Sequence, residues 1–109
     1  MFLILHNKTI NQDPILSALA RTFRHYPTIE CAALFGSRAR GDYREQSDYD
    51  IAVFGSLTSS EKTALRIFCA EELPTLHKID FIFMDEQVGA PIADSIQREG
   101  IIFYDKTGK

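Results

Sequence analysis

Two aspartates, Asp48 and Asp50, stand two residues apart at the start of the apolar run 51–54. Side chains alternate along a strand, so we expect both carboxylates on one face and Tyr49 on the other. Like charges held side by side repel by on the order of 1 kcal/mol in water, and by more where they are partly buried. Because oxygen ligands favour hard ions, the pair predicts a site for Mg²⁺, with Mn²⁺ as the alternative, rather than for zinc or copper.

A third carboxylate, Asp80, interrupts the later apolar run 78–84. An unpaired ionised group inside a buried strand is expensive. Asp80 therefore either lies at an exposed end of the sheet or shares metal ions with Asp48 and Asp50. An Asp-x-Asp pair alone is often a solvated turn, but three aspartates on two strands together favour metal-dependent chemistry.

A Gly-Ser turn and two arginines precede these carboxylates. Gly36 and Ser37 follow the apolar segment 30–35, where a residue without Cβ lets the backbone approach a ligand and leaves N–H groups to bind an anion. A helical turn beginning there would point further N–H groups at the same place. Arg38 and Arg40 add forked donors that match phosphate oxygens, although Arg40 could equally face a partner protein.

Composition limits the class of protein that can carry these motifs. The chain has 109 residues, of which 45% are hydrophobic and 25% charged, as in one compact domain spanning 1–109. A formal net charge of −3 gives no overall basic field for generic nucleic-acid binding. Phosphate chemistry must therefore depend on local charges.

Other features bear on location and on cysteine chemistry. The apolar run 1–5 is short and lacks a basic region before it, so we expect neither a signal peptide nor a membrane span, and a cytoplasmic protein. Cys31 and Cys69 lie far apart, with no second cysteine near either, which favours buried thiols over a zinc or redox motif.

Helix and strand signals alternate along the chain. Helices are predicted from Asp13-Pro14 to a stop at Pro27, from the capping-box pair Thr58 and Glu61 to Pro74, and from Pro91 to a capping Gly100; strands are predicted at 30–35, 48–54, 78–84 and 101–104. The pattern predicts an α/β (α+β) domain with a mixed four- to five-stranded sheet flanked by about three helices. Residues 36–47 look like a loop rather than a crossover helix, so the first two strands are expected to pair antiparallel.

One combination of motifs resembles the DNA polymerase beta-like nucleotidyltransferase superfamily and its fold. It consists of GSRARG at 36–41, DYDIAV at 48–53 and the later Asp80. The short length and the Gly-Ser-x-Ala-Arg-Gly form resemble, more narrowly, the minimal nucleotidyltransferase (MNT) domains of prokaryotes. Many of these domains are antitoxins to HEPN-domain toxins. The resemblance runs from the helix at Pro14 to the last strand.

This resemblance implies a protein adenylyltransferase that moves AMP from ATP to a hydroxyl group, with pyrophosphate leaving. The implied acceptor is a tyrosine of a HEPN-domain toxin partner, so a hetero-oligomer is possible. Catalysis and the binding of two Mg²⁺ ions are assigned to Asp48, Asp50 and Asp80, with Asp80 beside the nucleophile and also a candidate general base. Nucleotide binding is assigned to Gly36, Ser37, Arg38 and Arg40.

Two other classes of function remain open. The chain could be a catalytically silent antitoxin that neutralises its partner by binding alone, or a phosphate-binding regulatory module without transfer chemistry. The presence of all three aspartates and of the Gly-Ser turn favours activity. The sequence assigns no residue to a base pocket, and His6, His25 and His77 show no ligand spacing to one another.

Overall fold

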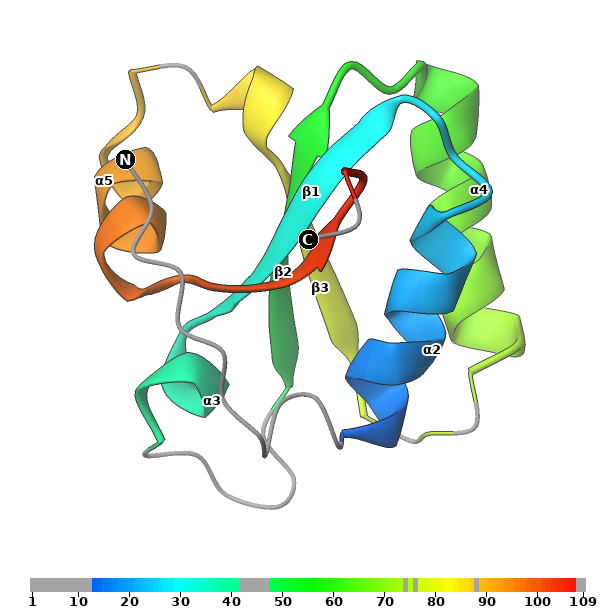
Figure 1. The fold of residues 1–109 in the computed structure, drawn as a ribbon, viewed down its shortest axis with the longest axis horizontal. Helices are drawn as coiled ribbons and strands as arrows, with labels where there is room; N and C mark the ends of the chain where they lie inside the picture. The colour runs from blue at the N-terminus through cyan, green and yellow to red at the C-terminus, as the bar shows by residue number, and fades with distance from the viewer. Residues whose placement is uncertain (1–12, 42–47, 74, 76, 88, 108–109) are drawn as a thin grey trace.

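A computed structural model gives the architecture (Figure 1) and describes residues 13–41, 48–73, 75, 77–87 and 89–107. In chain order the elements are α2 (Pro14–Phe23), β1 (Ile29–Phe35), α3 (Ser37–Arg40), β2 (Tyr49–Gly55), α4 (Ser59–Glu71), β3 (Ile79–Phe83), the 3-10 turn η1 (Met84–Glu86), α5 (Pro91–Glu99) and β4 (Ile101–Asp105). The strands form one sheet of four, in the order β3-β2-β1-β4.

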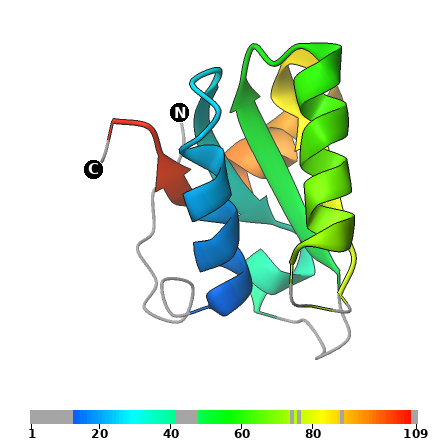
Figure 2. The same ribbon diagram turned by 90° about the vertical axis from the view of Figure 1, so that its right-hand side faces the viewer.

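The sheet is mixed, as the sequence predicts. β1 pairs antiparallel with both β2 and β4, whereas β3 runs parallel to β2. The antiparallel β1–β2 pair confirms that no long crossover separates these strands. α2 and α4 cover one face of the sheet and α5 lies on the other. α3 follows the end of β1, at the same end of the sheet as the starts of β2 and β3 (Figures 1 and 2).

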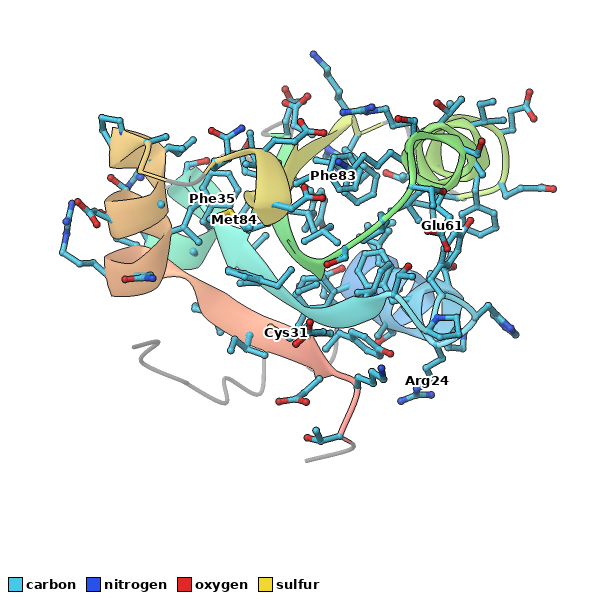
Figure 3. All side chains as sticks on the ribbon, turned by 90° about the horizontal axis from the view of Figure 1, so that it is seen from above. Arg24, Cys31, Phe35, Glu61, Phe83 and Met84 are labelled. Carbon is cyan, nitrogen blue, oxygen red and sulfur yellow. The ribbon has the colours of Figure 1, made fainter. Side chains whose placement is uncertain are left out.

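Two apolar clusters, one on each face, hold these layers together (Figure 3). The main core, under α2 and α4, contains the fully buried Leu19, Phe23, Leu65 and Phe83. The second cluster, under α5, is smaller: its fully buried members are Ala33, Ala52 and Ile96, and half-buried residues such as Phe35 and Met84 surround them. Burial of Ile51, Ala52 and Val53 confirms that β2 is covered on both sides.

The predicted helix starts are confirmed in detail. Asp13 is the N-cap of α2, and its Oδ1 accepts hydrogen bonds from the N–H groups of Ile15 and Leu16 at 2.8 and 3.2 Å. At α4 the capping box is complete: Thr58 N–H donates to Glu61 Oε1 at 2.8 Å, and Glu61 N–H donates to Thr58 Oγ1 at 3.1 Å. These bonds satisfy backbone donors that a helix start leaves unpaired.

The helix end predicted before Pro27 needs correction, whereas the one at Gly100 is confirmed. The helix before Pro27 ends at Phe23, so Tyr26 lies in a turn, where its N–H donates to the carbonyl of Phe23. The physical reason is that a proline disfavours helical backbone in the residue before it. Gly100 ends α5 as predicted; its backbone is extended (φ −68°, ψ 141°), because the chain turns directly into β4.

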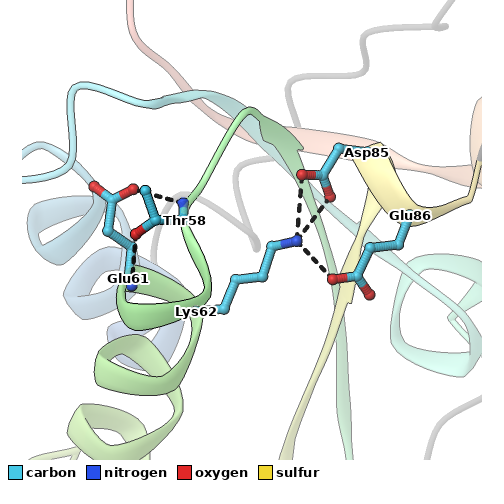
Figure 4. A network of polar contacts seen from close by, with 5 residues as sticks. All are labelled: Thr58, Glu61, Lys62, Asp85 and Glu86. Atoms are coloured by element: carbon cyan, nitrogen blue, oxygen red, sulfur yellow. Dashed lines mark hydrogen bonds and ion pairs between the residues drawn. The ribbon is translucent and has the colours of Figure 1, made fainter.

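A network of polar contacts after the last residue of β3 joins α4 to η1 (Figure 4). Lys62 Nζ lies 2.6 Å from Glu86 Oε2 and 3.2 Å from Asp85 Oδ1. Its side chain is only 12% exposed. Its ammonium also lies 5.2 Å from the centre of the Phe83 ring. The network therefore fixes α4 against the end of β3.

Both cysteines are free thiols, as the spacing predicts. Cys69 is buried, whereas Cys31 is only half-buried. Burial raises the pKa of Cys69 to about 12 and, with help from Asp105 and Glu30, that of Cys31 to about 11. Within the described part of the chain, no helix has the length and apolar composition needed to cross a bilayer.

Candidate active site

The parallel register of β2 and β3 brings two of the predicted carboxylates together. Asp50 and Asp80 are Cα partners across these strands, and neighbouring strands lie about 4.8 Å apart. Asp50 shares a face with Ala52, and Asp80 shares one with Ile82, both members of the second cluster. The two side chains therefore stand on the face that carries α5. Asp48, which is exposed, directly precedes β2.

The surroundings of Asp50 are unfavourable to its ionised carboxylate. Burial raises the pKa of Asp50, and the charges of Asp80 and Asp48 raise it further. Arg40 acts in the opposite direction, but the pKa stays above its usual value. A cation placed among these groups would relieve the repulsion.

The donor set suits a hard divalent ion, although the carboxylates are not gathered around one point. In the described residues no three His, Cys, Asp or Glu side chains are arranged so that they could hold a metal ion. Asp80 Oδ1 instead lies 3.4 Å from Lys78 Nζ, in an ion pair whose side chains are 40% and 71% exposed. Exposed pairs of this kind are weak, so an ion could displace Lys78 and draw Asp80 toward Asp50.

Gly36 places the predicted phosphate turn directly against Asp50. Its φ of +75° lies in the region that glycine adopts freely, and a Cβ added at this position would collide with the Asp50 carboxylate. Phe35, the residue before it, is the Cα partner of Asp50 across β1 and β2. The close approach of backbone to carboxylate therefore requires glycine here.

Tertiary contacts hold α3, which is only four residues long and has no side-chain N-cap. Ala39 packs against the main core. The guanidinium of Arg38 lies 4.0 Å from the centre of the Tyr49 ring, and Arg40 Nη1 lies 3.5 Å from Glu99 Oε1. The two predicted phosphate ligands thus diverge: Arg40 acts on Asp50, whereas Arg38 packs against a side chain of the α2 and α4 face.

Tyr49 is a site residue whose role the sequence reasoning missed. It is 4% exposed, and its hydroxyl donates to Asp13 Oδ2 at 2.8 Å. The ring also meets His77 edge to face, with 5.6 Å between ring centres. Strand alternation predicts that Tyr49 points away from the carboxylates, but no local signal shows that it joins the α2 N-cap to α3.

A groove adjoins Asp80 on the outer side of β3. It has a volume of about 610 Å³ and lies between α4 and β3. The described residues that line it are Arg66, Cys69, Ala70, Thr75, His77, Lys78, Ile79, Asp80 and Phe81. Residues 42–47, including Arg44, and His6 lie outside the described residues.

Comparisons with solved structures support the fold. A toxin–antitoxin complex with AMP-PNP gives a TM-score of 0.66 at 21% identity, covering 83% of this chain and 73% of that one. The toxin–antitoxin complex MntA–HepT gives 0.59 at 18%, covering 84% and 71%. A putative nucleotidyltransferase from Sulfolobus solfataricus gives 0.53 at 21%, covering 94% and 92%.

A search of curated proteins gave no significant match. A family model described as "Polymerase beta, Nucleotidyltransferase" matches residues 17–109, which include the Gly-Ser turn and all three aspartates. With this match over most of its length, and with the mixed sheet and helices described above, the chain belongs to the polymerase beta nucleotidyltransferase family.

Proposed function

We propose that the chain is a metal-dependent nucleotidyltransferase that moves AMP from ATP to a hydroxyl group of a partner protein, and that it acts as an antitoxin. The proposed acceptor is a tyrosine of a HEPN-domain toxin. Family membership supports nucleotidyl transfer. The antitoxin role is supported by the motif resemblance to MNT domains and by the fold shared with toxin–antitoxin complexes, one of them bound to AMP-PNP.

The observation that carries this proposal is the position of Asp50. It pairs with Asp80 of the neighbouring strand β3, follows Asp48 by two residues, and lies against the backbone of Gly36. The turn that we propose to bind phosphate and the three aspartates therefore lie at the same end of the sheet. Burial, together with the charges of Asp80 and Asp48, raises the pKa of Asp50, and a bound cation would relieve this imbalance.

Each residue has a role in this proposal. The backbone of Gly36 and Ser37 binds the β- and γ-phosphates, and Arg38 and Arg40 provide positive charge near them. Asp48 and Asp50 would hold two Mg²⁺ ions, with Asp80 as a further ligand to one of them. When bound, these ions would neutralise charge on the phosphates during transfer.

The reaction exchanges a phosphoanhydride bond of ATP for a phosphate ester bond to the acceptor. The acceptor oxygen forms a bond to the α-phosphorus, and the bond from that phosphorus to the bridging oxygen of the β-phosphate breaks. Pyrophosphate leaves from the side of the Gly36 turn. The hydroxyl proton passes to Asp80, the carboxylate nearest the groove, or to water.

Label transfer tests the proposal. The chain is incubated with α-labelled ATP, Mg²⁺ and the protein encoded by the neighbouring gene, and we expect covalent label on that protein. The Asp48→Ala, Asp50→Ala double variant should lose the label while its thermal unfolding remains cooperative. Asp94→Ala removes an exposed aspartate of α5 and is the matched control, which should label like the wild type.

Other outcomes decide against the assignment. Undiminished labelling by the double variant would show that these carboxylates are not catalytic. If no variant labels the partner, yet wild type and double variant both block its toxicity, the chain neutralises by binding alone.

A further inference from the structure

The groove between α4 and β3 shares a wall with the candidate active site. Asp80 lines the groove and is also the sheet neighbour of Asp50. A volume of about 610 Å³ is within the range of ligand-binding pockets. The Asp80 side chain stands on the α5 face of β3, and β3 is an edge strand of the sheet, so a segment seated in the groove would reach the proposed reaction centre around that edge.

If the proposed function holds, the order of the strands indicates from which side the acceptor approaches the reaction centre. The strands run β3-β2-β1, so the Gly36 turn follows β1, Asp50 lies on β2, and Asp80 and the groove lie on β3. In an in-line displacement the entering and leaving groups stand on opposite sides of the phosphorus. With pyrophosphate held at the turn, the acceptor must approach from β3.

The lining of the groove indicates what kind of acceptor fits. Arg66 of α4, His77 and Lys78 place basic side chains around it, in a chain whose net charge is −3. Arg66 is held over the Phe83 ring, with its guanidinium carbon 4.9 Å from the ring centre. Asp80 is the one carboxylate among the described lining residues.

An apolar contact surface continues from the groove along α4. Ile67, next to Arg66, is 51% exposed and is the one large hydrophobic residue of the described chain that is classed as exposed. Ala70 follows three residues later, on the same side of the helix, and lines the groove. Single exposed apolar residues are common, but this one lies beside a basic groove that leads to Asp80.

We propose that the α4–β3 groove docks an acidic, partly apolar segment of the acceptor protein and delivers its hydroxyl group to Asp80. Acidic side chains of the segment pair with Arg66 and Lys78, and an apolar side chain packs on Ile67. Few basic side chains combined with an apolar wall fit a peptide better than a polynucleotide, which would need a longer row of cations.

Charge reversal on α4 tests this docking surface. The probes are two fluorescein-labelled peptides, each with a tyrosine and a leucine, one flanked by glutamates and the other by lysines. Binding is measured by fluorescence anisotropy with AMP-PNP and Mg²⁺ present, and AMP transfer is measured with ATP. Arg66→Glu is compared with Arg21→Glu, which reverses the charge of an exposed arginine on α2.

Wild type and Arg21→Glu should bind the acidic peptide about tenfold more tightly than the basic one, and Arg66→Glu should abolish this preference. AMP-PNP binding should be equal in all three proteins. Equal binding of both peptides by wild type, or equal behaviour of the two variants, would overturn the inference. Tighter binding of a labelled RNA oligonucleotide that Arg66→Glu abolishes would also overturn it.

The two proposals can fail separately. If wild type shows the peptide preference but transfers no AMP to any acceptor, the groove stands and the proposed activity falls. If AMP reaches the acceptor protein at the same rate with Arg66→Glu as with Arg21→Glu, the activity stands and the groove assignment falls.

Discussion

The acidic residues at the two ends of β3 differ in how their charges are balanced. After its last residue, Asp85 and Glu86 share the ammonium of Lys62 (Figure 4). Near its first residue, Asp80 stands beside Asp50, with Asp48 close enough to raise the pKa of Asp50 further. Where the acids join elements of the fold, Lys62 bonds to both of them. At the candidate site Asp80 pairs with the exposed Lys78, and the balance at Asp50 remains unfavourable.

The contacts after the last residue of β3 therefore serve stability, whereas the carboxylates near its first residue are candidates for function. The hydrogen bond from Lys62 to Glu86, and to a lesser extent that to Asp85, raises the pKa of the lysine. These contacts therefore stabilise the fold until the pH rises through that raised pKa. At the other end, the raised pKa of Asp50 means that its ionised carboxylate opposes folding. Unfavourable charge that a sequence retains at one place marks a candidate functional site.

Replacing Asp50 by Asn should produce the largest effect, and in opposite directions for activity and stability. We expect AMP transfer to fall about a thousandfold, because one of the groups that organise charge around the phosphates is lost. The melting temperature should rise at neutral pH. Label transfer and calorimetry measure the two quantities.

The sign of the stability change follows from the pKa of Asp50, which is higher in the folded chain than its ordinary value. Folding is favoured while the carboxyl is protonated, and this stability is lost as pH rises through the folded-state pKa. The gain in melting temperature for Asp50→Asn should therefore disappear in acid, below pH of about 4. A variant that is less stable than wild type at neutral pH would break the comparison.

Changes at Tyr49, the first residue of β2, should have effects of intermediate size on stability and on ATP binding. Tyr49→Phe keeps the ring under Arg38 but loses the hydrogen bond to Asp13, and should destabilise by about 1 kcal/mol with an unchanged KM for ATP. Tyr49→Leu also loses the stack and should raise that KM about tenfold. Steady-state kinetics and urea unfolding distinguish the two; an equal KM in both variants would show that the ring does not orient Arg38.

Lys62→Met should have the smallest effect, confined to stability. The aliphatic part of the side chain still packs near Phe83, but the contacts to Asp85 and Glu86 are lost. The melting temperature should fall by a few degrees, and AMP transfer should stay at the wild-type rate. Reduced transfer at a temperature where the variant is folded would show that the two ends of β3 are coupled.

Much of the fold could be predicted because its signals are local. Asp13 before Pro14, and Thr58 three residues before Glu61, identify helix starts through bonds between near neighbours in sequence. The apolar run at 51–54 predicts a strand covered on both faces, and Ile51, Ala52 and Val53 are buried. The errors fall at ends such as Tyr26, where a following proline and a turn decide the boundary.

The sequence by itself determined the chemical inventory: three aspartates on two strands, a glycine that can approach a ligand, and two arginines. The tertiary structure decided their arrangement, pairing Asp50 with Asp80, placing Gly36 against Asp50, and directing Arg38 to Tyr49 and Arg40 to Glu99. Residue type and alternation are local properties that a sequence displays. Strand register and contacts between distant segments depend on how the whole core packs, so only the folded chain reveals them.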